Sequence, residues 1–496
     1  VAITAKEKCC PMEKVECFGC PNAAGYYERR GQALREGMSI QALDAEKIAA
    51  LAQKYEICPH ELSLDLSEQA DVIICDYNYA FDPRVRLRRF FDHKSNAGLL
   101  VDEAHNLPDR AREMLSASLS GAQIEDVRRL VGKYEGRESP MYNLLTDLLK
   151  LFTRPEAEPE ITSELPADTI EALSNISDIL DQIELVEPET RALAIDLAWF
   201  VRVARKFDET CDRFMILPEE KRIQMRVWRF DPSAHLKKVF ANVGGAAMFS
   251  ATLAPMDHYA RQLGLDPRED AMLRLESPFP RENLLVARLP VSVRFADRER
   301  TLGAVTEIIH ALSASRPGNY LACFPSFQYL NQAFERYRLV HPDDFVIRQS
   351  PGMGEEARAA FIECFEPNPG ASMVAFVVMG GVFAEGVDLP DDRLSGAAIV
   401  STGIPQIGIE REWMRELFDD GLGGGYDVAY TYPGICRVLQ AAGRVIRTET
   451  DRGVVLLMDV RYGQENMQNL LPEHWKVEKI KKMSALTVRL DKFWNG

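Results

Sequence analysis

Residues 98–105, which read Gly-Leu-Leu-Val-Asp-Glu-Ala-His, constrain the fold more than any other stretch of the chain. The apolar run that ends at Val101 predicts a buried strand of a parallel sheet. Because ligands of open α/β sheets bind at the carboxyl ends of the strands, Asp102 and Glu103 would face a nucleotide there. Asp102 could then hold Mg²⁺, and Glu103 could activate the water that attacks a phosphate. The alternative is a strand end capped by two solvated acids.

The length and composition of the chain are those of a globular protein with several domains. Its 496 residues fit roughly two to four domains. Hydrophobic residues make up 46% and charged residues 27%, and no apolar run approaches the roughly 20 residues of a membrane span. We therefore expect a cytoplasmic protein with no membrane partner. The net charge of −16 argues against general attraction to nucleic acid, so any such contact must come from local basic patches.

Five of the ten cysteines lie near the start of the chain, which favours a metal site over disulfides. From Cys10 the spacing is C-x₆-C-x₂-C through Cys17 and Cys20, and Cys58 is the distant fourth cysteine. Four thiolates can hold a 4Fe–4S cluster or a tetrahedral zinc ion. Cys9 competes with Cys10 for the first position, and a set of unrelated reduced cysteines is the remaining alternative.

A basic and aromatic segment follows the cysteines. Residues 72–74 predict a buried strand, and Tyr77 and Asn78 come shortly after it. Arg84 is the first of four arginines within residues 84–89. Aromatic rings beside arginines are typical of surfaces that stack bases and follow a nucleic-acid backbone, so Tyr77, Asn78 and Arg84 are candidate contacts to nucleic acid. A solvated helix face with ordinary aromatic packing explains the pattern equally well.

Residues 107–235 differ in character from the sheet-forming parts, because they contain amphipathic helical stretches such as residues 124–130. A crossover between parallel strands needs only about a dozen residues, and the next strand comes at residues 246–253. We therefore expect a helical domain inserted between two strands of one sheet. Ser250 and Thr252 at the end of that strand could couple two sites through their hydroxyl groups, although such residues are common at strand ends.

A second α/β region begins near residue 257. It contains four apolar runs that predict strands, at residues 320–326, 372–379, 398–403 and 453–459. Residues 439–447 predict a helix on which Gln440, Arg444 and Arg447 share one face, at positions i, i+4 and i+7. Arginines presented together suit a phosphate clamp. The alternative is a surface helix with solvated arginines.

Taken together, these segments resemble the XPD/DinG branch of superfamily-two DNA helicases, most closely its bacterial DinG-related group. Residues 102–105 match the Asp-Glu-Ala-His form of the family's Walker B box, and residues 250–252 match its Ser-Ala-Thr coupling motif. Residues 381–388 resemble its fifth motif, and residues 440–447 match its sixth motif, Q-x-x-G-R-x-I-R. The four-cysteine segment precedes the acidic box, as it does in that family. The resemblance covers nearly the whole chain.

The resemblance implies an α/β fold with two RecA-like parallel-sheet motor domains, the first carrying an iron–sulfur insertion and a helical arch insertion. Motor domain 1 would comprise residues 1–106 and 236–256, with the iron–sulfur domain at about residues 6–66. The arch would comprise residues 107–235, and motor domain 2 would comprise residues 257–496.

The resemblance also implies an ATP-dependent helicase that moves 5′ to 3′ on single-stranded DNA in repair or replication. Its cofactors would be ATP, Mg²⁺ and a 4Fe–4S cluster, and its partners single-stranded and forked or flapped duplex DNA. The residues for catalysis and nucleotide binding are Asp102, Glu103, His105, Gly386, Asp388, Gln440, Arg444 and Arg447. The coupling residues are Ser250 and Thr252, and the cluster ligands are Cys10, Cys17, Cys20 and Cys58. The DNA contacts are Tyr77, Asn78 and Arg84, joined by Phe324 and Ser326 from the family's fourth motif.

One motif of that family is missing from the sequence. No G-x-x-x-x-G-K-S/T phosphate-binding loop occurs in residues 1–496, and Val1 lies in what reads as a strand already under way. We therefore expect the loop to lie upstream of Val1, and the chain alone to hydrolyse little ATP. The rival hypothesis is a non-catalytic iron–sulfur or zinc scaffold that binds nucleic acid without ATP turnover.

Overall fold

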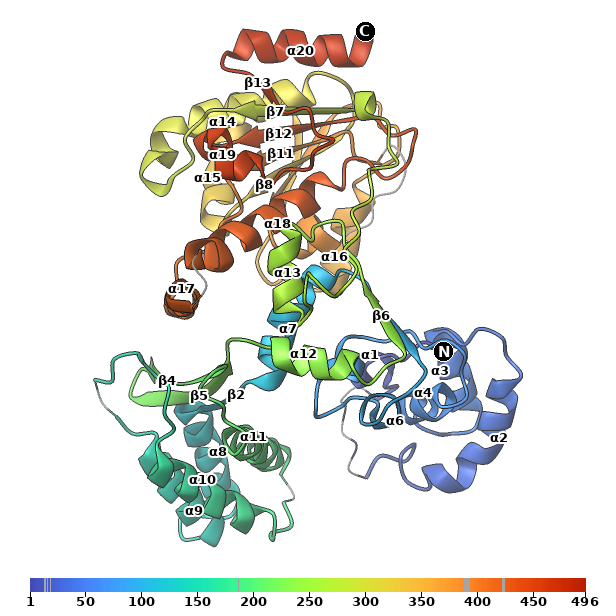
Figure 1. Ribbon diagram of the computed structural model, residues 1–496, viewed down its shortest axis with the longest axis vertical. Coiled ribbons are helices and arrows are strands. Elements are labelled where there is room, and N and C mark those ends of the chain that lie inside the picture. The colour runs from blue at the N-terminus through green and yellow to red at the C-terminus, as the bar shows by residue number, and fades with distance from the viewer. Residues whose placement is uncertain are drawn as a thin grey trace. The chain divides into compact units, whose positions relative to one another are not determined.

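The computed structural model describes residues 1–496 except positions 13, 14, 16, 18, 155, 186, 387–392 and 422–423. Its elements divide into two compact units (Figure 1). Unit 1 comprises Val1–Val101 and Asn106–Met248, and unit 2 comprises Asp102–His105 and Phe249–Gly496. No helix among the described residues is long and apolar enough to cross a membrane.

Unit 1 begins with four helices, α1 (Lys6–Cys9), α2 (Tyr26–Met38), α3 (Ala45–Lys54) and α4 (Pro59–Ser67). The side chain of Asp44 caps α3 by accepting the N–H of Lys47 at 2.9 Å. Apolar residues at helical spacing, such as Ile48 and Leu51, pack against Leu62 in a small core of their own. The helical pattern between the third and fourth clustered cysteines therefore forms a packed helical subregion.

The two strands predicted in the first part of the chain fare differently. Residues 72–74 do not form a buried strand: Val72 and Ile74 are 66% and 68% exposed, and only a single parallel bridge joins Ile74 to Ala2. Strand β1 (Gly98–Val101) forms where predicted and pairs in parallel with β6 (Gly245–Met248). Leu100 is nevertheless 75% exposed, and among the described residues β6 is the single strand that pairs with β1. An apolar sequence therefore predicts that a strand pairs in a sheet more reliably than it predicts that the strand is buried.

Short helices precede and follow this sheet. They are α5 (Asn78–Phe81), α6 (Arg88–Phe91), α7 (Leu107–Leu115) and α12 (Ser233–Phe240). The ring nitrogen Nε2 of His235 in α12 lies 3.0 Å from the carbonyl oxygen of Phe81, and the two rings of Phe81 and Phe240 meet edge to face at 5.7 Å. These contacts join α12 to α5 within unit 1.

The predicted helices between residues 107 and 235 form as α8 (Gly121–Tyr134), α9 (Pro140–Leu151), α10 (Ala167–Leu180) and α11 (Pro188–Ala204). They pack on a four-stranded antiparallel sheet that the sequence analysis did not predict, of order β2-β5-β4-β3. Its strands are β2 (Ala117–Ser120), β3 (Glu160–Thr162), β4 (Asp212–Glu219) and β5 (Arg222–Arg229). Buried residues alternate with more exposed ones along β5, so a period of two was readable there.

Unit 2 contains a parallel sheet of seven strands in the order β13-β7-β12-β11-β8-β10-β9. The strands are β7 (Leu284–Leu289), β8 (Asn319–Phe324), β9 (Phe345–Arg348), β10 (Met373–Val378), β11 (Gly396–Val400), β12 (Gly453–Met458) and β13 (Glu478–Lys479). The four strands predicted in this region are β8, β10, β11 and β12, and all four lie at the centre of the sheet. Their nearly continuous apolar sequence reflects burial on both faces.

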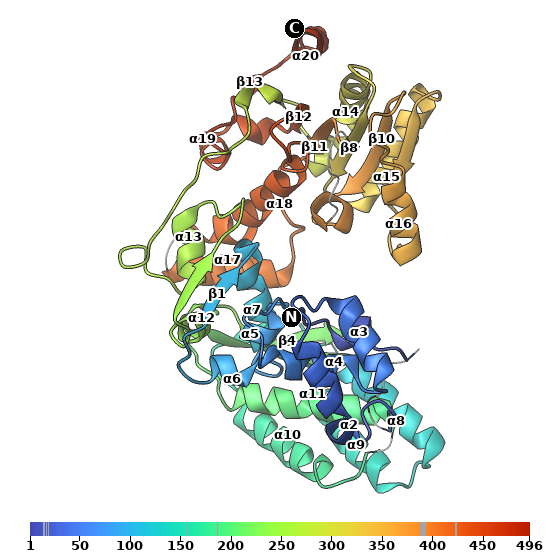
Figure 2. The ribbon, with the colours of Figure 1, turned by 90° about the vertical axis from the view of Figure 1, so that its right-hand side faces the viewer.

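Helices cover both faces of this sheet (Figure 2). One face packs on α14 (Arg298–Ser313), α15 (Phe327–Val340) and α20 (Met483–Asn495). The other packs on α16 (Glu355–Glu363), α18 (Tyr432–Ala442) and α19 (Glu465–Gln468). Helices α13 (Met256–Gln262) and α17 (Ile409–Gly421) complete the unit. This confirms a doubly covered α/β fold for the second half of the chain.

Candidate functional site

The acidic end of β1 has an unusual backbone. Glu103 has a φ of 47°, in the left-handed region that non-glycine residues rarely adopt. Its N–H donates to Oδ1 of Asp102 at 2.8 Å, and the N–H of Ala104 donates to the carbonyl oxygen of Phe249 at 3.1 Å. The turn therefore presents two exposed carboxylates directly after the strand and before a short 3-10 helix, Ala104–Asn106.

His105 lies behind the carboxylates and is almost fully buried. Its Nδ1 lies 2.8 Å from Oγ of Ser250 and 3.3 Å from Oε2 of Glu103. Its Nε2 lies 2.7 Å from the amide nitrogen, Nε2, of Gln440, which donates to it when the ring is neutral. The Ser250 hydroxyl donates to Oε2 of Glu103 at 3.0 Å, so it accepts from Nδ1–H of His105. This arrangement requires His105 to carry a proton on Nδ1.

Hydroxyl groups extend this network to α18. Oγ of Ser250 lies 3.2 Å from Oγ1 of Thr252, and the thiol of Cys436 donates to Oγ1 of Thr252 at 3.3 Å. Cys436 and Gln440 are four residues apart on α18, so they lie on one face of the helix. A continuous chain of polar contacts thus runs from the Glu103 carboxylate to α18. The sequence analysis missed Cys436, although its spacing from Gln440 was a usable signal.

The charges of this network favour an ion pair. The hydrogen bond from His105 lowers the pKa of Glu103, and Ser250 and the charge of Arg444 act in the same direction against the opposing effect of burial. Burial disfavours protonated His105, but hydrogen bonds and Coulombic attraction from Cys436 and Glu103 outweigh it and raise the pKa of His105 to about 9. The raised pKa of His105 and the lowered pKa of Glu103 favour an ion pair at neutral pH, in which the Gln440 amide, whose nitrogen faces Nε2 of His105 here, must turn its oxygen toward Nε2–H.

The helix that carries Gln440 ends earlier than predicted. α18 ends at Ala442, so Arg444 and Arg447 lie beyond it rather than on its face. Oδ2 of Asp451 accepts the N–H of Arg447 at 2.6 Å, which holds the chain in a turn after the helix. Arg444 is half-buried and acts on the charge of Glu103, whereas Arg447 is exposed. The structure thus brings Gln440 and Arg444 to the acidic site, and the role of Arg447 stays a prediction.

The fifth-motif segment is described in part. The turn Val382–Gly386 follows β10 and includes Gly386. Asp388 lies outside the described residues. The roles predicted for Gly386 and Asp388 stay predictions.

The candidate DNA contacts of unit 1 are already engaged in packing. Arg84 forms a bidentate ion pair with Asp82, at 3.2 Å or less, and its guanidinium lies 5.0 Å from the ring centroid of Trp199. The ring of Tyr77 packs edge to face against Phe81 at 6.3 Å. Asn78 begins α5, and its N–H is held by Asp76 at 3.0 Å. All three keep partly exposed surface, so both interpretations of this segment remain open.

The two fourth-motif residues of unit 2 differ from each other. Phe324 is fully buried at the end of β8 and stacks on Phe376 at 5.7 Å, which argues against direct contact with a base. Ser326 caps α15 by accepting the N–H of Tyr329 at 3.3 Å and is half-buried. Core packing accounts for the position of Phe324, and helix capping accounts for the position of Ser326.

The clustered cysteines are held near one another by backbone contacts. The N–H of Cys20 donates to the carbonyl of Cys17 at 3.4 Å, and the N–H of Cys58 donates to Asn22 at 3.0 Å. Burial raises the pKa of Cys9, and the neighbouring Cys58 and Cys10 thiols raise it further. All are free thiols, and within the described ranges no three cysteine sulfurs lie within 4.8 Å of one another. The donor chemistry suits iron or zinc, and the structure leaves the choice between Cys9 and Cys10 open.

Comparisons with known proteins agree with this architecture. The family described as DEAD_2 matches residues 2–124, and the family described as helicase C-terminal domain matches residues 309–478. Regulator of telomere elongation helicase 1 of Homo sapiens is 23% identical over 89% of this chain. The XPD helicase subunit of general transcription and DNA repair factor IIH of Dictyostelium discoideum is 22% identical over 86% of this chain. The chain spans 45% of the first relative and 67% of the second.

Solved structures give the same fold. An XPD helicase structure superposes with a TM-score of 0.61 at 19% identity, covering 97% of this chain and 86% of that one. The structure of Xpd4 of S. tokodaii gives a TM-score of 0.54 at 14% identity, covering 84% and 83%. Fold and site together define an α/β protein with the parallel-sheet fold of XPD helicases. Over most of its length the chain is a distant homologue of XPD-like, DEAD_2 helicases of superfamily two.

Proposed function

We propose that this chain is the motor part of an ATP-dependent DNA helicase. The observation that carries the proposal is the network in unit 2 that joins the Asp102–Glu103 strand end to Ser250, Thr252 and Gln440. An isolated pair of solvated acids would not require a buried, protonated histidine tied to a second polypeptide segment. A buried histidine that contacts both the acid and a second segment suits a site that transmits the state of a bound phosphate to that segment.

In this proposal, Glu103 orients and deprotonates the attacking water. Its carboxylate is ionised at neutral pH and can accept a hydrogen bond from water. Ser250 and His105 hold one carboxylate oxygen, Oε2, which fixes the direction of the group. The protonated His105 also compensates the charge of Glu103 behind the site.

Asp102 is the residue proposed to hold Mg²⁺. Its carboxylate is exposed at the strand end and oriented by the Glu103 N–H, and oxygen ligands of this kind suit a hard cation. When bound, Mg²⁺ would neutralise phosphate charge. Arg444, whose charge reaches Glu103, and Arg447 would contribute positive charge at the γ-phosphate.

Coupling to DNA is proposed to run through His105 and Gln440. When His105 is protonated, the Gln440 amide must present its oxygen to Nε2–H, and when His105 is neutral it must present its nitrogen. A change in charge at Glu103 during turnover would therefore change the hydrogen bond that Gln440 of α18 makes with His105. Gly386 and Asp388 of the fifth motif are proposed to take part in the same response.

The finer assignments follow the family. We propose a 4Fe–4S cluster on Cys10, Cys17, Cys20 and Cys58 within residues 6–66, an arch at residues 107–235, and motor domain 2 at residues 257–496. We propose movement 5′ to 3′ on single-stranded DNA, with forked or flapped duplexes as substrates in repair or replication. Tyr77, Asn78, Arg84 and Ser326 remain the proposed DNA contacts, whereas the burial of Phe324 removes it from direct contact.

The test is DNA-stimulated ATP hydrolysis by the protein as its gene encodes it. Glu103→Gln keeps the shape and hydrogen bonding of the side chain but removes the base, so turnover should fall about 10²–10⁴-fold while nucleotide binding is kept. Glu113→Gln, on an exposed glutamate of α7, is the matched control and should hydrolyse like the parent. Normal turnover by the Glu103→Gln protein would remove the acidic strand end from the mechanism.

A second measurement separates helicase from scaffold. Single-strand binding should weaken with salt at about −0.7 in log–log slope per phosphate neutralised. Arg84→Ala should reduce this slope, and Arg129→Ala, on an exposed arginine of α8, should not. Strong DNA binding without any DNA-stimulated ATPase would favour the non-catalytic scaffold.

A further inference from the structure

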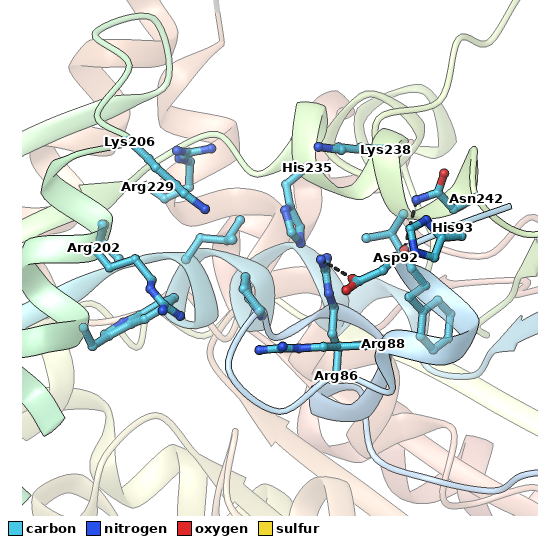
Figure 3. Close-up of a pocket in the computed structure, with 16 residues that line it drawn as sticks. Arg86, Arg88, Asp92, His93, Arg202, Lys206, Arg229, His235, Lys238 and Asn242 are labelled. Atoms are coloured by element: carbon cyan, nitrogen blue, oxygen red, sulfur yellow. Dashed lines mark hydrogen bonds and ion pairs between the residues drawn. The ribbon is translucent and has the colours of Figure 1, made fainter. Parts of the chain in front are cut away.

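Unit 1 contains a pocket of about 580 Å³, lined in part by Arg86 and Arg88 of the arginine-rich segment 84–89. Residues from five parts of the unit line it: the α5–α6 segment, the end of α7, α11 and its end, β5, and α12. Figure 3 shows Arg202, Lys206 and Arg229 on one side, Arg86 and Arg88 on another, and His235 between them. The volume lies within the range of ordinary small-ligand sites, about 300–1,000 Å³.

The lining is strongly cationic. Six arginine or lysine side chains line the pocket, against one carboxylate, Asp92. They are Arg86, Arg88, Arg202, Lys206, Arg229 and Lys238. This concentration of positive charge stands out in a chain whose net charge is −16. Like charges gathered in this way repel one another unless an anion joins them.

Two of the six cations have carboxylate partners. Arg86 pairs with Asp92 at 2.5 Å, and Nη2 of Arg229 donates to the buried Asp212 at 2.9 Å. The other four, Arg88, Arg202, Lys206 and Lys238, have no carboxylate or hydrogen-bond partner among the residues that the structure describes. Four charges therefore remain uncompensated around one hollow.

The positive charge of the lining affects the pKa of His235. Its Nε2 donates to the carbonyl oxygen of Phe81 at 3.0 Å, which holds the ring in place. Burial lowers the pKa of His235, and the charges of Arg86, Arg229 and Lys238 lower it further. Phe91 and Trp199 add apolar surface to the lining. A ligand for this pocket therefore combines negative charge with a size that fills a partly apolar hollow.

We propose that this pocket binds phosphoryl groups. Arginine presents a planar fork that matches phosphate oxygens, and lysine adds point charge, so the lining has the donors that phosphate requires. The same groups occur in a small oligophosphate and in the backbone of a nucleic-acid strand. The proposal uses none of the residues of the acidic site in unit 2, so it stands whether or not that site hydrolyses ATP.

The experiment is isothermal titration of the whole chain with sodium pyrophosphate, and separately with a single-stranded oligothymidylate, at low and matched ionic strength. The double variant Arg202→Gln/Lys238→Gln should weaken pyrophosphate binding about tenfold or more, since hydrogen bonds to charged groups are the strong ones. Lys237→Gln is the matched control, because Lys237 is exposed on the same helix but does not line the pocket. Thermal unfolding checks that all variants are folded.

The two arms distinguish the source of the phosphate. Loss of pyrophosphate binding alone in the double variant supports a small phosphorylated ligand, and loss in both arms supports a strand whose backbone enters the pocket. Loss of oligothymidylate binding alone also supports the strand. The proposal is overturned if the parent binds neither probe, or if the double variant binds both as tightly as the Lys237→Gln control.

Discussion

The imidazole of His105 lies 2.7 Å from the side-chain amide of Gln440, although 335 residues separate them in the chain. The contact lies within unit 2 and ties the end of the acidic strand to α18. Because His105 also contacts Ser250 and Glu103, one buried ring links three segments that are remote in sequence. The charge of this ring is therefore the natural quantity to measure.

His105 should titrate far above an ordinary histidine. Its pKa of about 9 compares with about 6.5 for a free side chain, so the folded protein retains a proton that the unfolded chain has lost. The contribution of His105 to stability should be complete below pH about 6.5 and should disappear as the pH rises through about 9. NMR titration of ¹³C-labelled histidine rings measures this pKa directly. It should fall in Glu103→Gln, and an ordinary value in the parent would contradict the ion pair.

Replacing Arg447 tests whether Arg444 and Arg447, which follow α18, supply positive charge during ATP hydrolysis. Arg447→Ala in the protein as its gene encodes it should lower DNA-stimulated ATP turnover, because a cation matched to the charge of the transition state is lost. Arginine fingers contribute about 10³–10⁵-fold. Arg336→Ala, on an exposed arginine of α15, is the control. Since Arg447 lies beyond α18 and is exposed, full activity of the Arg447→Ala protein would assign the charge to Arg444 alone.

The cysteine cluster makes a colorimetric prediction. Protein purified without oxygen should be brown and contain about four irons per chain, and Cys58→Ser should lose them. Cys10→Ser should lose the iron and Cys9→Ser should keep it. The reverse result would assign the first ligand to Cys9, which lies close to Cys58. Stoichiometric zinc without visible absorbance would exclude the cluster, and Cys364→Ser serves as the control because it lies in unit 2.

A buried ion pair stabilises the region of unit 1 in which α8–α11 pack on the sheet of β2–β5. Asp212 has no exposed surface and pairs with Arg229 across the β4–β5 ladder. Asp212→Asn keeps the volume but leaves the arginine without its partner, so the unfolding free energy of unit 1 should fall by about 3–5 kcal/mol. Urea denaturation followed by circular dichroism measures this change. Asp178→Asn, on an exposed aspartate of α10, should stay within about 0.5 kcal/mol of the parent.

Sequence patterns predicted which strands pair and where motifs lie better than they predicted which strands are buried and where helices end. The octet around Asp102 correctly predicted a parallel strand, yet Leu100 is exposed, because burial depends on which segments pack on a strand. The helix of Gln440 was correct, but its end at Ala442 depends on local contacts, such as Asp451 holding the N–H of Arg447. Such contacts leave no periodic trace in the sequence.

The candidate site was predicted in part for the same reason. Asp102, Glu103, Ser250 and Gln440 stand out by motif, whereas Cys436 becomes visible once α18 is laid against Thr252. Phe324 was predicted to contact DNA from its match to the family's fourth motif, but it is fully buried. Site residues that belong to contiguous motifs could be predicted from the sequence, and those brought to the site by packing could not.

The left-handed backbone of Glu103 limits what laboratory evolution can do with this protein. A non-glycine residue held at a φ of 47° costs on the order of 1–3 kcal/mol. Glycine adopts that conformation freely, so selection for thermal stability alone would favour replacing Glu103 with glycine and would discard the carboxylate. Libraries screened for heat tolerance without an accompanying activity screen should therefore enrich stable, chemically silent variants at this position.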